Sequence, residues 1–157
     1  MEVVKTVIQI DSREKARAIQ KILADFDKQG ITHFVSKLPC GDYMSLDNAR
    51  FCIDRKQNLF ELCGNVCQQH ERFINELKRA NMLGIKLVFL VEHSRGIKIL
   101  EDVQKWKNPR LKESKYAVSG ERLYKTLSTL EKRYDTKFYF CDKPNTGKRI
   151  IELLSAG

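Results

Sequence analysis

The sequence IKLVFLV, residues 85–91, is an almost unbroken apolar run in which Lys86 is the only polar residue. Such a run, rich in β-branched and aromatic side chains, predicts a strand buried on both faces of a sheet. Apolar residues recur at helical spacing over residues 58–80, with a break near Gly64, and again from the expected N-cap Ser119 to residue 134. A buried strand between two amphipathic helices predicts an α/β domain with a mixed sheet flanked by helices.

The N-terminal part of the chain is expected to supply most of the remaining strands. Residues 3–10 predict a first strand that ends at Asp11, and Ser12 is the expected N-cap of a helix that extends to Gly30. Three further segments predict an antiparallel meander: residues 32–38, 43–46 and 50–56. The predicted fold ends with a strand and a helix, at residues 137–141 and 147–154.

Length and composition restrict the class of protein. With 157 residues, 42% hydrophobic and 31% charged, the chain is expected to fold as one globular domain over residues 1–157. No apolar run reaches the ~18–20 residues of a membrane span, and residues 1–10 lack the features of a signal peptide. We therefore expect an intracellular protein without a membrane partner, cytoplasmic if bacterial or phage-encoded and nuclear if eukaryotic. Five cysteines, an odd number, favour reduced and buried thiols over a disulfide framework.

Positive charge is concentrated toward the C-terminus. Residues 1–94 hold 14 Lys and Arg against 12 Asp and Glu, a net charge of +2, whereas residues 95–157 hold 15 against 8, a net charge of +7. Such an asymmetry is typical of proteins that bind a polyanion, with nucleic acid as the first candidate and an anionic membrane surface as the second. Solvated cations on an ordinary surface are the alternative.

A mobile basic segment is expected at residues 93–119, around a short helix at residues 100–106. Trp106 and Tyr116 in this segment either stack on bases or pin the segment to the core. The candidates for binding DNA phosphates are Lys105, Lys107, Arg110, Lys112 and Lys115. Lys148 and Arg149 open the last predicted helix, where backbone amides and two cations can hold a second phosphate stretch, although the spacing is not that of a P-loop.

Four acidic residues stand at the ends of predicted strands: Asp11, Asp42, Asp54 and Glu92. Asp42 follows Gly41 in a predicted turn, so hairpin pairing brings it close to Asp54 and Lys56. Because side chains alternate along a strand, Asp54 and Lys56 point to one face of the sheet and Arg55 points to the other. Two carboxylates and a lysine suit a Mg²⁺-dependent phosphodiesterase, since carboxylates hold Mg²⁺, the metal activates a water, and the lysine offsets charge on the phosphate.

Four short motifs carry a resemblance to a known family: DSRE at residues 11–14, GDY at 41–43, IDRK at 53–56 and VE at 91–92. In order and spacing they resemble the nuclease domain of the XPF family of structure-selective endonucleases, which includes the archaeal Hef nuclease and belongs to the PD-(D/E)xK, restriction-endonuclease-like superfamily. The resemblance covers about residues 5–154. It implies a restriction-endonuclease-like mixed sheet, without the helix-hairpin-helix tail of many relatives.

The same resemblance implies an activity and its partners. The implied function is that of a DNA endonuclease dependent on Mg²⁺ or Mn²⁺, which hydrolyses phosphodiester bonds at branched or flap DNA in repair or recombination. Relatives work as dimers, so the resemblance implies a homodimer or a partner protein that strengthens DNA binding.

Individual residues also receive implied roles from the resemblance. Asp42 and Asp54 are the implied metal ligands, and the Lys56 amine is implied to lie at the scissile phosphate. Arg13 is implied to line the site, and Arg55 to support the site or to contact DNA. The full implied catalytic set is Asp11, Glu14, Asp42, Asp54 and Lys56.

Two residues depart from the family signature, which is GD, a spacer, ERK, three residues and D. Asp54 stands where the family has Glu, and it is shorter by one methylene group. Glu61 lies one residue beyond the final acid of the signature, which rotates it by about 100° on a helix. The roles of Glu61 and Glu92 are therefore left open.

Three other interpretations are kept alongside. A catalytically silent DNA-binding module or scaffold of the same fold is the main alternative, although an intact Asp42, Asp54 and Lys56 set argues against it. A nuclease that acts on RNA is the second. The third is a zinc site at Cys63, Cys67 and His70, but cysteines at i and i+4 on an amphipathic helix are more often core residues.

Overall fold

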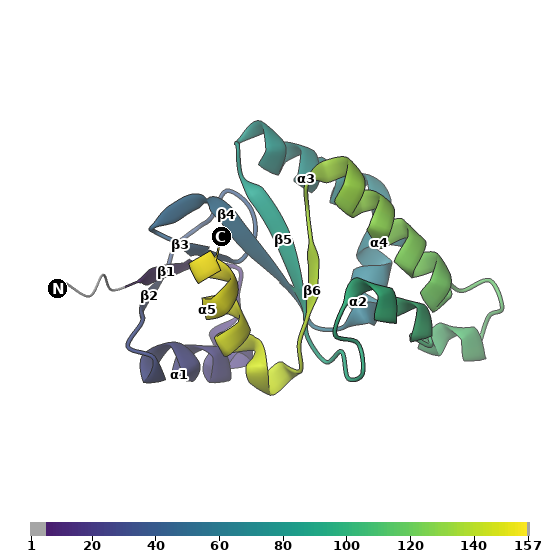
Figure 1. The fold of residues 1–157 in the computed structure, drawn as a ribbon, viewed down its shortest axis with the longest axis horizontal. Helices are drawn as coiled ribbons and strands as arrows, with labels where there is room; N and C mark the ends of the chain where they lie inside the picture. Colours follow the sequence, from purple (N-terminus) through teal and green to yellow (C-terminus); the bar gives the residue numbers. More distant parts are fainter. Residues whose placement is uncertain (1–5, 157) are drawn as a thin grey trace.

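The computed structural model describes residues 6–156 and shows a six-stranded mixed sheet between two layers of helices (Figure 1). The strands are β1 (Val7–Ile10), β2 (Thr32–Val35), β3 (Tyr43–Ser45), β4 (Asn48–Lys56), β5 (Lys86–Val91) and β6 (Phe138–Phe140). They lie in the order β2-β1-β3-β4-β5-β6, and β5 pairs in parallel with both β4 and β6. The predicted α/β fold with a mixed sheet is confirmed.

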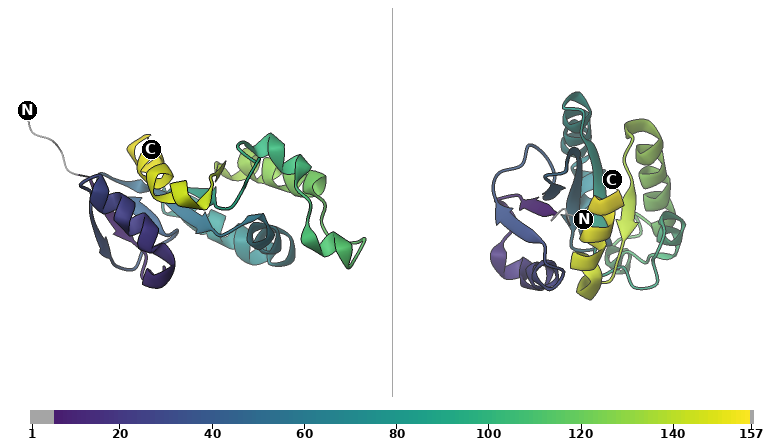
Figure 2. Two further views of the ribbon diagram at one scale, coloured as in Figure 1. Left: turned by 90° about the horizontal axis from the view of Figure 1, so that it is seen from below. Right: turned by 60° about the vertical axis from the view of Figure 1, so that its left-hand side comes forward.

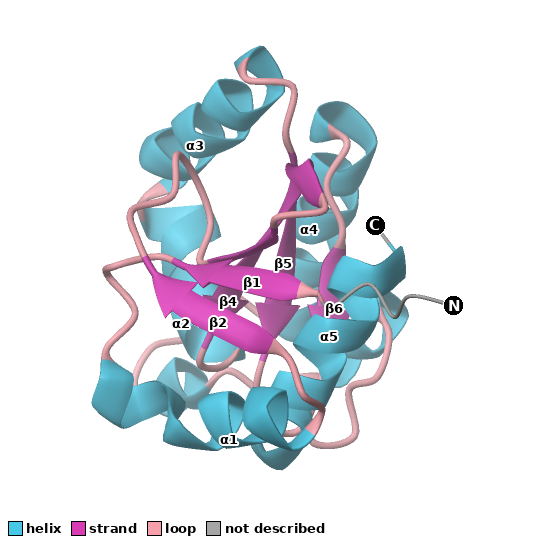
Figure 3. Cartoon of the chain, turned by 90° about the vertical axis from the view of Figure 1, so that its left-hand side faces the viewer, coloured by secondary structure: helices cyan, strands magenta, loops and turns pink. Residues whose placement is uncertain are grey.

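Helices cover both faces of this sheet. One face carries α1 (Gln20–Lys28) and α5 (Thr146–Ala156), and the other carries α2 (Leu59–Cys63), α3 (His70–Met82) and α4 (Gly120–Tyr134). Figure 3 shows the sheet between α1 and α3. Alternation along β4 divides the core, because Cys52 packs with the α2–α4 layer while Phe51 and Ile53 pack with the α1–α5 layer. β5 is apolar on both sides because both of its faces are covered.

The predicted antiparallel meander is correct only for β3 and β4. β2 lies at the edge of the sheet and pairs in parallel with β1, which pairs antiparallel with β3. The cause is the long connection after β1 through the 3₁₀ turn η1 (Ala16–Ile19) and α1, because a crossover of that length returns the chain in the same direction. Of the first predicted strand, residues 3–5 lie outside the described residues, and β1 begins at Val7.

The prediction that Ser12 caps the first helix is wrong. The helical segment begins at Ala16, and Lys15 in the N-cap position makes no side-chain capping bond. Asp11 organises this turn instead, since its carboxylate accepts from the Arg13 amide at 3.1 Å and its carbonyl oxygen accepts from the Glu14 amide at 3.0 Å. The helix therefore starts about one turn later than predicted.

The helix predicted over residues 58–80 breaks where the sequence suggested. A π-helical turn, η2 (Gly64–Gln68), separates α2 from α3. Cys63 is buried in the core, and His70 Nδ1 lies 2.9 Å from the Val66 carbonyl oxygen. In the described part of the chain, no three His, Cys, Asp or Glu side chains are arranged to hold a metal, which gives the zinc interpretation no support.

The basic segment is anchored rather than loose. It contains two short 3₁₀ helices, η3 (Leu100–Lys105) and η4 (Pro109–Lys112). Trp106 packs against the core, which agrees with the pinning role. The buried side chain of Asn108 accepts from the Arg110 amide and donates to the Val118 carbonyl oxygen, both at 3.0 Å. These contacts fix both ends of the loop that carries η4.

The five cysteines are all free thiols, and Cys40, Cys52 and Cys63 are buried, as predicted. Residues 6–156 include no helix with the length and apolar character that crossing a membrane requires.

Gly120 allows α4 to approach η3 closely. A Cβ at this position would lie 2.4 Å from the Trp106 carbonyl oxygen and 2.6 Å from that of Val103. Because backbone atoms yield little, we expect Gly120→Ala to destabilise the fold by about 1–3 kcal/mol and to lower the melting temperature measured by circular dichroism. Gly64→Ala is the matched control, since its nearest neighbouring atom is 3.9 Å away and alanine favours a helix. Equal melting temperatures for the two variants would contradict this account.

Candidate active site

Pairing of β3 with β4 brings the two predicted metal ligands together. Tyr43 pairs with Ile53, and the Asp42 amide donates to the Ile53 carbonyl oxygen at 2.7 Å. In return the Arg55 amide donates to Asp42 Oδ2 at 2.8 Å, which fixes the Asp42 carboxylate beside the end of β4. Lys56 Nζ lies 3.2 Å from Asp54 Oδ1. Asp54 and Lys56 therefore share one face of the sheet, as alternation predicted.

The carboxylate pair carries negative charge that the protein only partly neutralises. Burial raises the pKa of Asp42 to about 8, and the charges of Asp54 and Glu14 act in the same direction. Burial also raises the pKa of Asp54 to about 6, with Lys56 opposing and Glu76 adding to the shift. Carboxyl groups held this far above their ordinary pKa favour a bound cation.

The donor set fits a divalent ion of the magnesium type. Asp42, just before β3, and Asp54 on β4 offer hard oxygen ligands, and Mg²⁺ keeps several waters and needs only one or two carboxylates. Lys56 stays protonated in this setting: burial alone would lower its pKa, but the charge and hydrogen bond of Asp54 outweigh burial and raise it. The site thus combines two carboxylates that could hold a metal ion with a fixed ammonium group.

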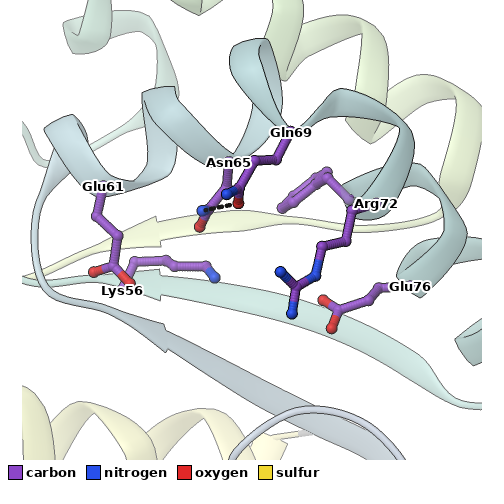
Figure 4. Close-up of a pocket in the computed structure, with 7 residues that line it drawn as sticks. Lys56, Glu61, Asn65, Gln69, Arg72 and Glu76 are labelled. Carbon is purple, nitrogen blue, oxygen red and sulfur yellow. Dashed lines mark hydrogen bonds between the residues drawn. The ribbon is translucent and has the colours of Figure 1, made fainter.

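A polar hollow of about 240 Å³ opens beside Lys56, between β4 and the α2–α3 segment (Figure 4). Figure 4 shows Lys56 and Arg72 pointing into this hollow from β4 and α3. Asn65 donates to Gln69 Oε1 at 3.4 Å, while its own buried Oδ1 has no hydrogen-bond partner among the described residues. The hollow therefore offers a second cation and a free acceptor beside the carboxylate pair.

The sequence carries a signal for this wall that lies outside the four short motifs. Five polar residues are spaced four, four, three and four apart on the helical segment, which is one face of a helix: Glu61, Asn65, Gln69, Arg72 and Glu76. Glu61 also completes the N-terminus of α2, where its carboxylate accepts from the Gln57 amide at 2.8 Å and Asn58 accepts from the Glu61 amide. These two hydrogen bonds give Glu61 a structural role at the start of α2, in addition to its place in the wall.

Arg55 points to the opposite face and is buried there, with 7% of its side chain exposed. Its Nε lies 2.8 Å from Glu14 Oε2, and its Nη1 bonds to Glu92. Tyr43 donates to Glu14 at 2.6 Å, and Thr146 of α5 donates to Glu92 at 2.7 Å. Of the two roles left open for Arg55, support of the site fits this placement, and Glu14 and Glu92 serve as its buried counter-ions.

Asp11 is fully buried, and both of its oxygens are engaged. Oδ1 accepts from the Leu38 amide at 2.8 Å, and Oδ2 accepts from Arg13 Nε at 2.6 Å. Burial would raise the pKa of Asp11, but these hydrogen bonds from Leu38 and Arg13 outweigh it and lower the pKa. Asp11 thus holds the turn that presents Arg13. The Arg13 side chain is exposed. The hydrogen bond to Asp11 is the main cause of the rise in the pKa of Arg13, and the nearby charge of Asp42 adds to that rise.

The predicted DNA contacts fall on two faces of the molecule. Those of the basic segment are exposed on the same side of the sheet as the hollow: Lys105, Lys107, Arg110 and Lys112. Lys148 and Arg149 lie on α5, which covers the opposite face. Arg149 is engaged there by Glu152 at 2.8 Å and lies 5.4 Å from the ring centre of Tyr139. The structure therefore does not bring α5 cations to the carboxylate pair.

Comparison with known proteins agrees with this arrangement. Two solved structures of XPF from Aeropyrum pernix, one of them a complex with DNA, match with a TM-score of 0.67 at 19% and 18% sequence identity. They cover 96% and 97% of this chain, which spans 64% of the length of each of those chains. At this identity the likeness shows the fold, and the expected restriction-endonuclease-like architecture is confirmed. A comparison with curated proteins finds no match.

A family model for the ERCC4 domain matches residues 10–154, from the end of β1 to the last turns of α5. The match contains all four motifs on which the resemblance to the XPF nucleases rested, together with the carboxylate pair and Lys56. The resemblance is thus confirmed, and this protein belongs to the ERCC4 domain family.

Proposed function

We propose that this protein is a metal-dependent DNA endonuclease that hydrolyses phosphodiester bonds at branched or flap DNA. The observation that carries the proposal is the pair of carboxylates, Asp42 and Asp54, beside a protonated Lys56 at the edge of a polar hollow. Membership of the ERCC4 domain family supports nuclease chemistry. The branched substrate and a homodimer or partner protein rest on the resemblance to the XPF nucleases.

Each part of the site has a distinct task in this proposal. Asp42 and Asp54 would hold Mg²⁺ or Mn²⁺, with water completing the coordination. When bound, the metal lowers the pKa of a water and stabilises the leaving oxygen. Lys56, fixed by Asp54, is placed to bind a phosphate oxygen and to offset the charge that develops there. Arg72 faces the same hollow as a second cation for the phosphate.

Several observations support DNA as the substrate. One of the structures with the same fold, XPF from Aeropyrum pernix, was solved in complex with DNA. A carboxylate-rich site repels phosphate until metal binds, so other residues must hold the strand. We assign this task to Lys105, Lys107, Arg110 and Lys112 of the basic segment, with Arg13 at the site and Lys148 and Arg149 binding a second phosphate stretch. An intracellular location fits this function.

A cleavage assay tests the proposal against a silent DNA-binding scaffold and an RNA nuclease. Labelled forks, flaps, duplexes, single strands and RNA are incubated with Mg²⁺, Mn²⁺, Ca²⁺ or EDTA. We expect cleavage of branched DNA with Mg²⁺ and Mn²⁺ only, because Ca²⁺ prefers longer and more flexible coordination.

Asp42→Asn and Asp54→Asn should each lower the rate by at least ~10² at nearly unchanged DNA affinity. The control is Asp47→Asn, an exposed Asp at the other end of the β3–β4 hairpin. Wild-type rates in both active-site variants, or undiminished cleavage in EDTA, would refute the mechanism.

The carboxylate pair also predicts a pH-dependent stability in the absence of metal. The pKa values of about 8 for Asp42 and about 6 for Asp54 exceed the ordinary 3.8, so above that value the folded state binds more protons than the unfolded state. These groups therefore make folding less favourable as pH rises toward about 8. In EDTA, Asp42→Asn should raise the melting temperature by at least ~3 °C at about pH 8.5 and change it little at about pH 4.5. A lower melting temperature at both pH values would contradict the charge repulsion.

The basic segment is expected to set the salt dependence of DNA binding. Lys107 and Lys112 are exposed and make no ion pair with a carboxylate of residues 6–156. If each neutralises one phosphate, Lys107→Ala with Lys112→Ala should flatten the log-log salt slope on duplex DNA by about 1.8 in fluorescence anisotropy. Lys132→Ala with Arg133→Ala, at the far end of α4, removes the same charge as a control. An unchanged slope in the first variant would show that these lysines are merely solvated.

A further inference from the structure

A second pocket lies on the other side of the helical segment that forms the active-site wall. It has a volume of about 380 Å³, and it is enclosed by α2, η2, the loop that carries η4, and the start of α4. Phe60 lines this pocket while its neighbour Glu61 lines the hollow beside Lys56. The pocket and the hollow beside Lys56 therefore lie on two sides of the same helical segment, α2 and η2. In Figure 2 the η4 segment projects at the end of the molecule that carries α2 and α3.

Two arginines line this pocket without a carboxylate partner. Arg110 of η4 and Arg122 of α4 make no ion pair with any carboxylate in the described part of the chain, whereas Arg13, Arg55 and Arg149 are all paired. Both are exposed. A hydrogen bond with Cys67 and burial raise the pKa of Cys63, which lines the pocket, and the charges of both arginines oppose that rise. Two free guanidinium groups converging on one pocket are suited to an anion with several oxygens, such as a phosphate.

Two aromatic side chains are exposed at the same pocket. Phe60 is 48% exposed and Tyr116 is 80% exposed, although burial of a large aromatic ring would stabilise the fold. Lys115 Nζ lies 5.3 Å from the ring centre of Tyr116, which adds a cation beside this ring. Exposed rings beside unpaired cations are the arrangement with which proteins hold unpaired nucleotides, by stacking on the base and pairing with the phosphate.

We propose that this pocket binds an unpaired nucleotide of single-stranded DNA, with the base against Phe60 and Tyr116 and its phosphate on Arg110 and Arg122. The inference rests on the proposed function and specifies how a branched substrate is recognised: the single-stranded arm is held on one flank of the α2–η2 helix while the scissile strand lies on the other. A base within a duplex is stacked and cannot enter a pocket unless it is extruded. The pocket therefore favours single strands over duplex.

Binding measured in EDTA tests this pocket independently of cleavage. The probes are a labelled oligothymidylate of ~12 nucleotides and a duplex of ~12 base pairs. Phe60→Ala with Tyr116→Ala should weaken binding of the single strand at least about tenfold and change duplex binding less than about twofold. Arg110→Ala with Arg122→Ala should flatten the salt slope on the single strand by about 1.4. Phe34→Ala, an exposed ring on the edge strand β2, and the Lys132 and Arg133 double variant are the controls.

Cys67 provides a reporter in the wild-type protein, because it lines the pocket. Its pKa is lowered to about 7 by a hydrogen bond with Cys63 and, against burial, by the charge of Arg122, so we expect alkylation by iodoacetamide near neutral pH. The oligothymidylate should slow alkylation of Cys67, followed by mass spectrometry of its peptide, while the duplex and free thymidine monophosphate at equal concentration should not.

Three results would overturn the inference. The first is unchanged single-strand affinity in the aromatic variant, the second is equal protection of Cys67 by single strand and duplex, and the third is full protection by the mononucleotide alone. The proposed function fails separately, if the wild-type protein cleaves no DNA with Mg²⁺ or Mn²⁺. Circular dichroism melting of each variant checks that its fold is intact.

Discussion

The guanidinium group of Arg55 is buried between the carboxylates of Glu14 and Glu92, and these two ion pairs tie together the elements that build the site. Glu14 comes from the turn after β1, Glu92 from the end of β5, and Thr146 of α5 completes the network through Glu92. A buried charge is tolerated only when its partners are held in place, and loss of one partner from such a network costs about 3–5 kcal/mol. The network therefore fixes the position of the end of β4. Because side chains alternate along β4, the residue that anchors the strand lies between the two residues, Asp54 and Lys56, that face the candidate active site.

The anchored strand holds a charge arrangement that does not favour folding by itself. Asp42 and Asp54 are kept close and largely buried. Burial and the charges of neighbouring carboxylates raise their pKa values, and the charge of Lys56 only partly offsets this rise. A protein selected for stability alone would replace one of them with a neutral residue. A divalent cation would supply the missing positive charge, and raised carboxyl pKa values beside a fixed lysine are typical of functional sites.

The helical segment from α2 through η2 to α3 connects this site to the second pocket. This segment packs one apolar face against the sheet, and the residues on its two other sides line the hollow beside Lys56 and the second pocket. The π-turn at Gly64–Gln68 joins α2 to α3, and Arg72 of α3 lines the same hollow as Lys56. The basic segment completes the second pocket because Asn108 and Trp106 anchor it there. One helical segment thus contributes to both candidate DNA-binding surfaces.

Local pattern was enough to identify β5, the helices on either side of it, the break at Gly64 and the facing of Asp54 and Lys56, because each depends on periodicity along a few neighbouring residues. The parallel position of β2 was not readable in this way, because it depends on the length and direction of a crossover. The family resemblance implied that Asp11 and Glu14 line the active site and that Arg55 supports the site or contacts DNA. Only the tertiary structure shows their partners: Arg55 is paired with Glu14 and Glu92, and Asp11 accepts from the Leu38 amide, a residue far away in the sequence. Which charges are free to act on a substrate and which hold the fold together depends on these long-range partners, and their identity is fixed only when the chain is packed.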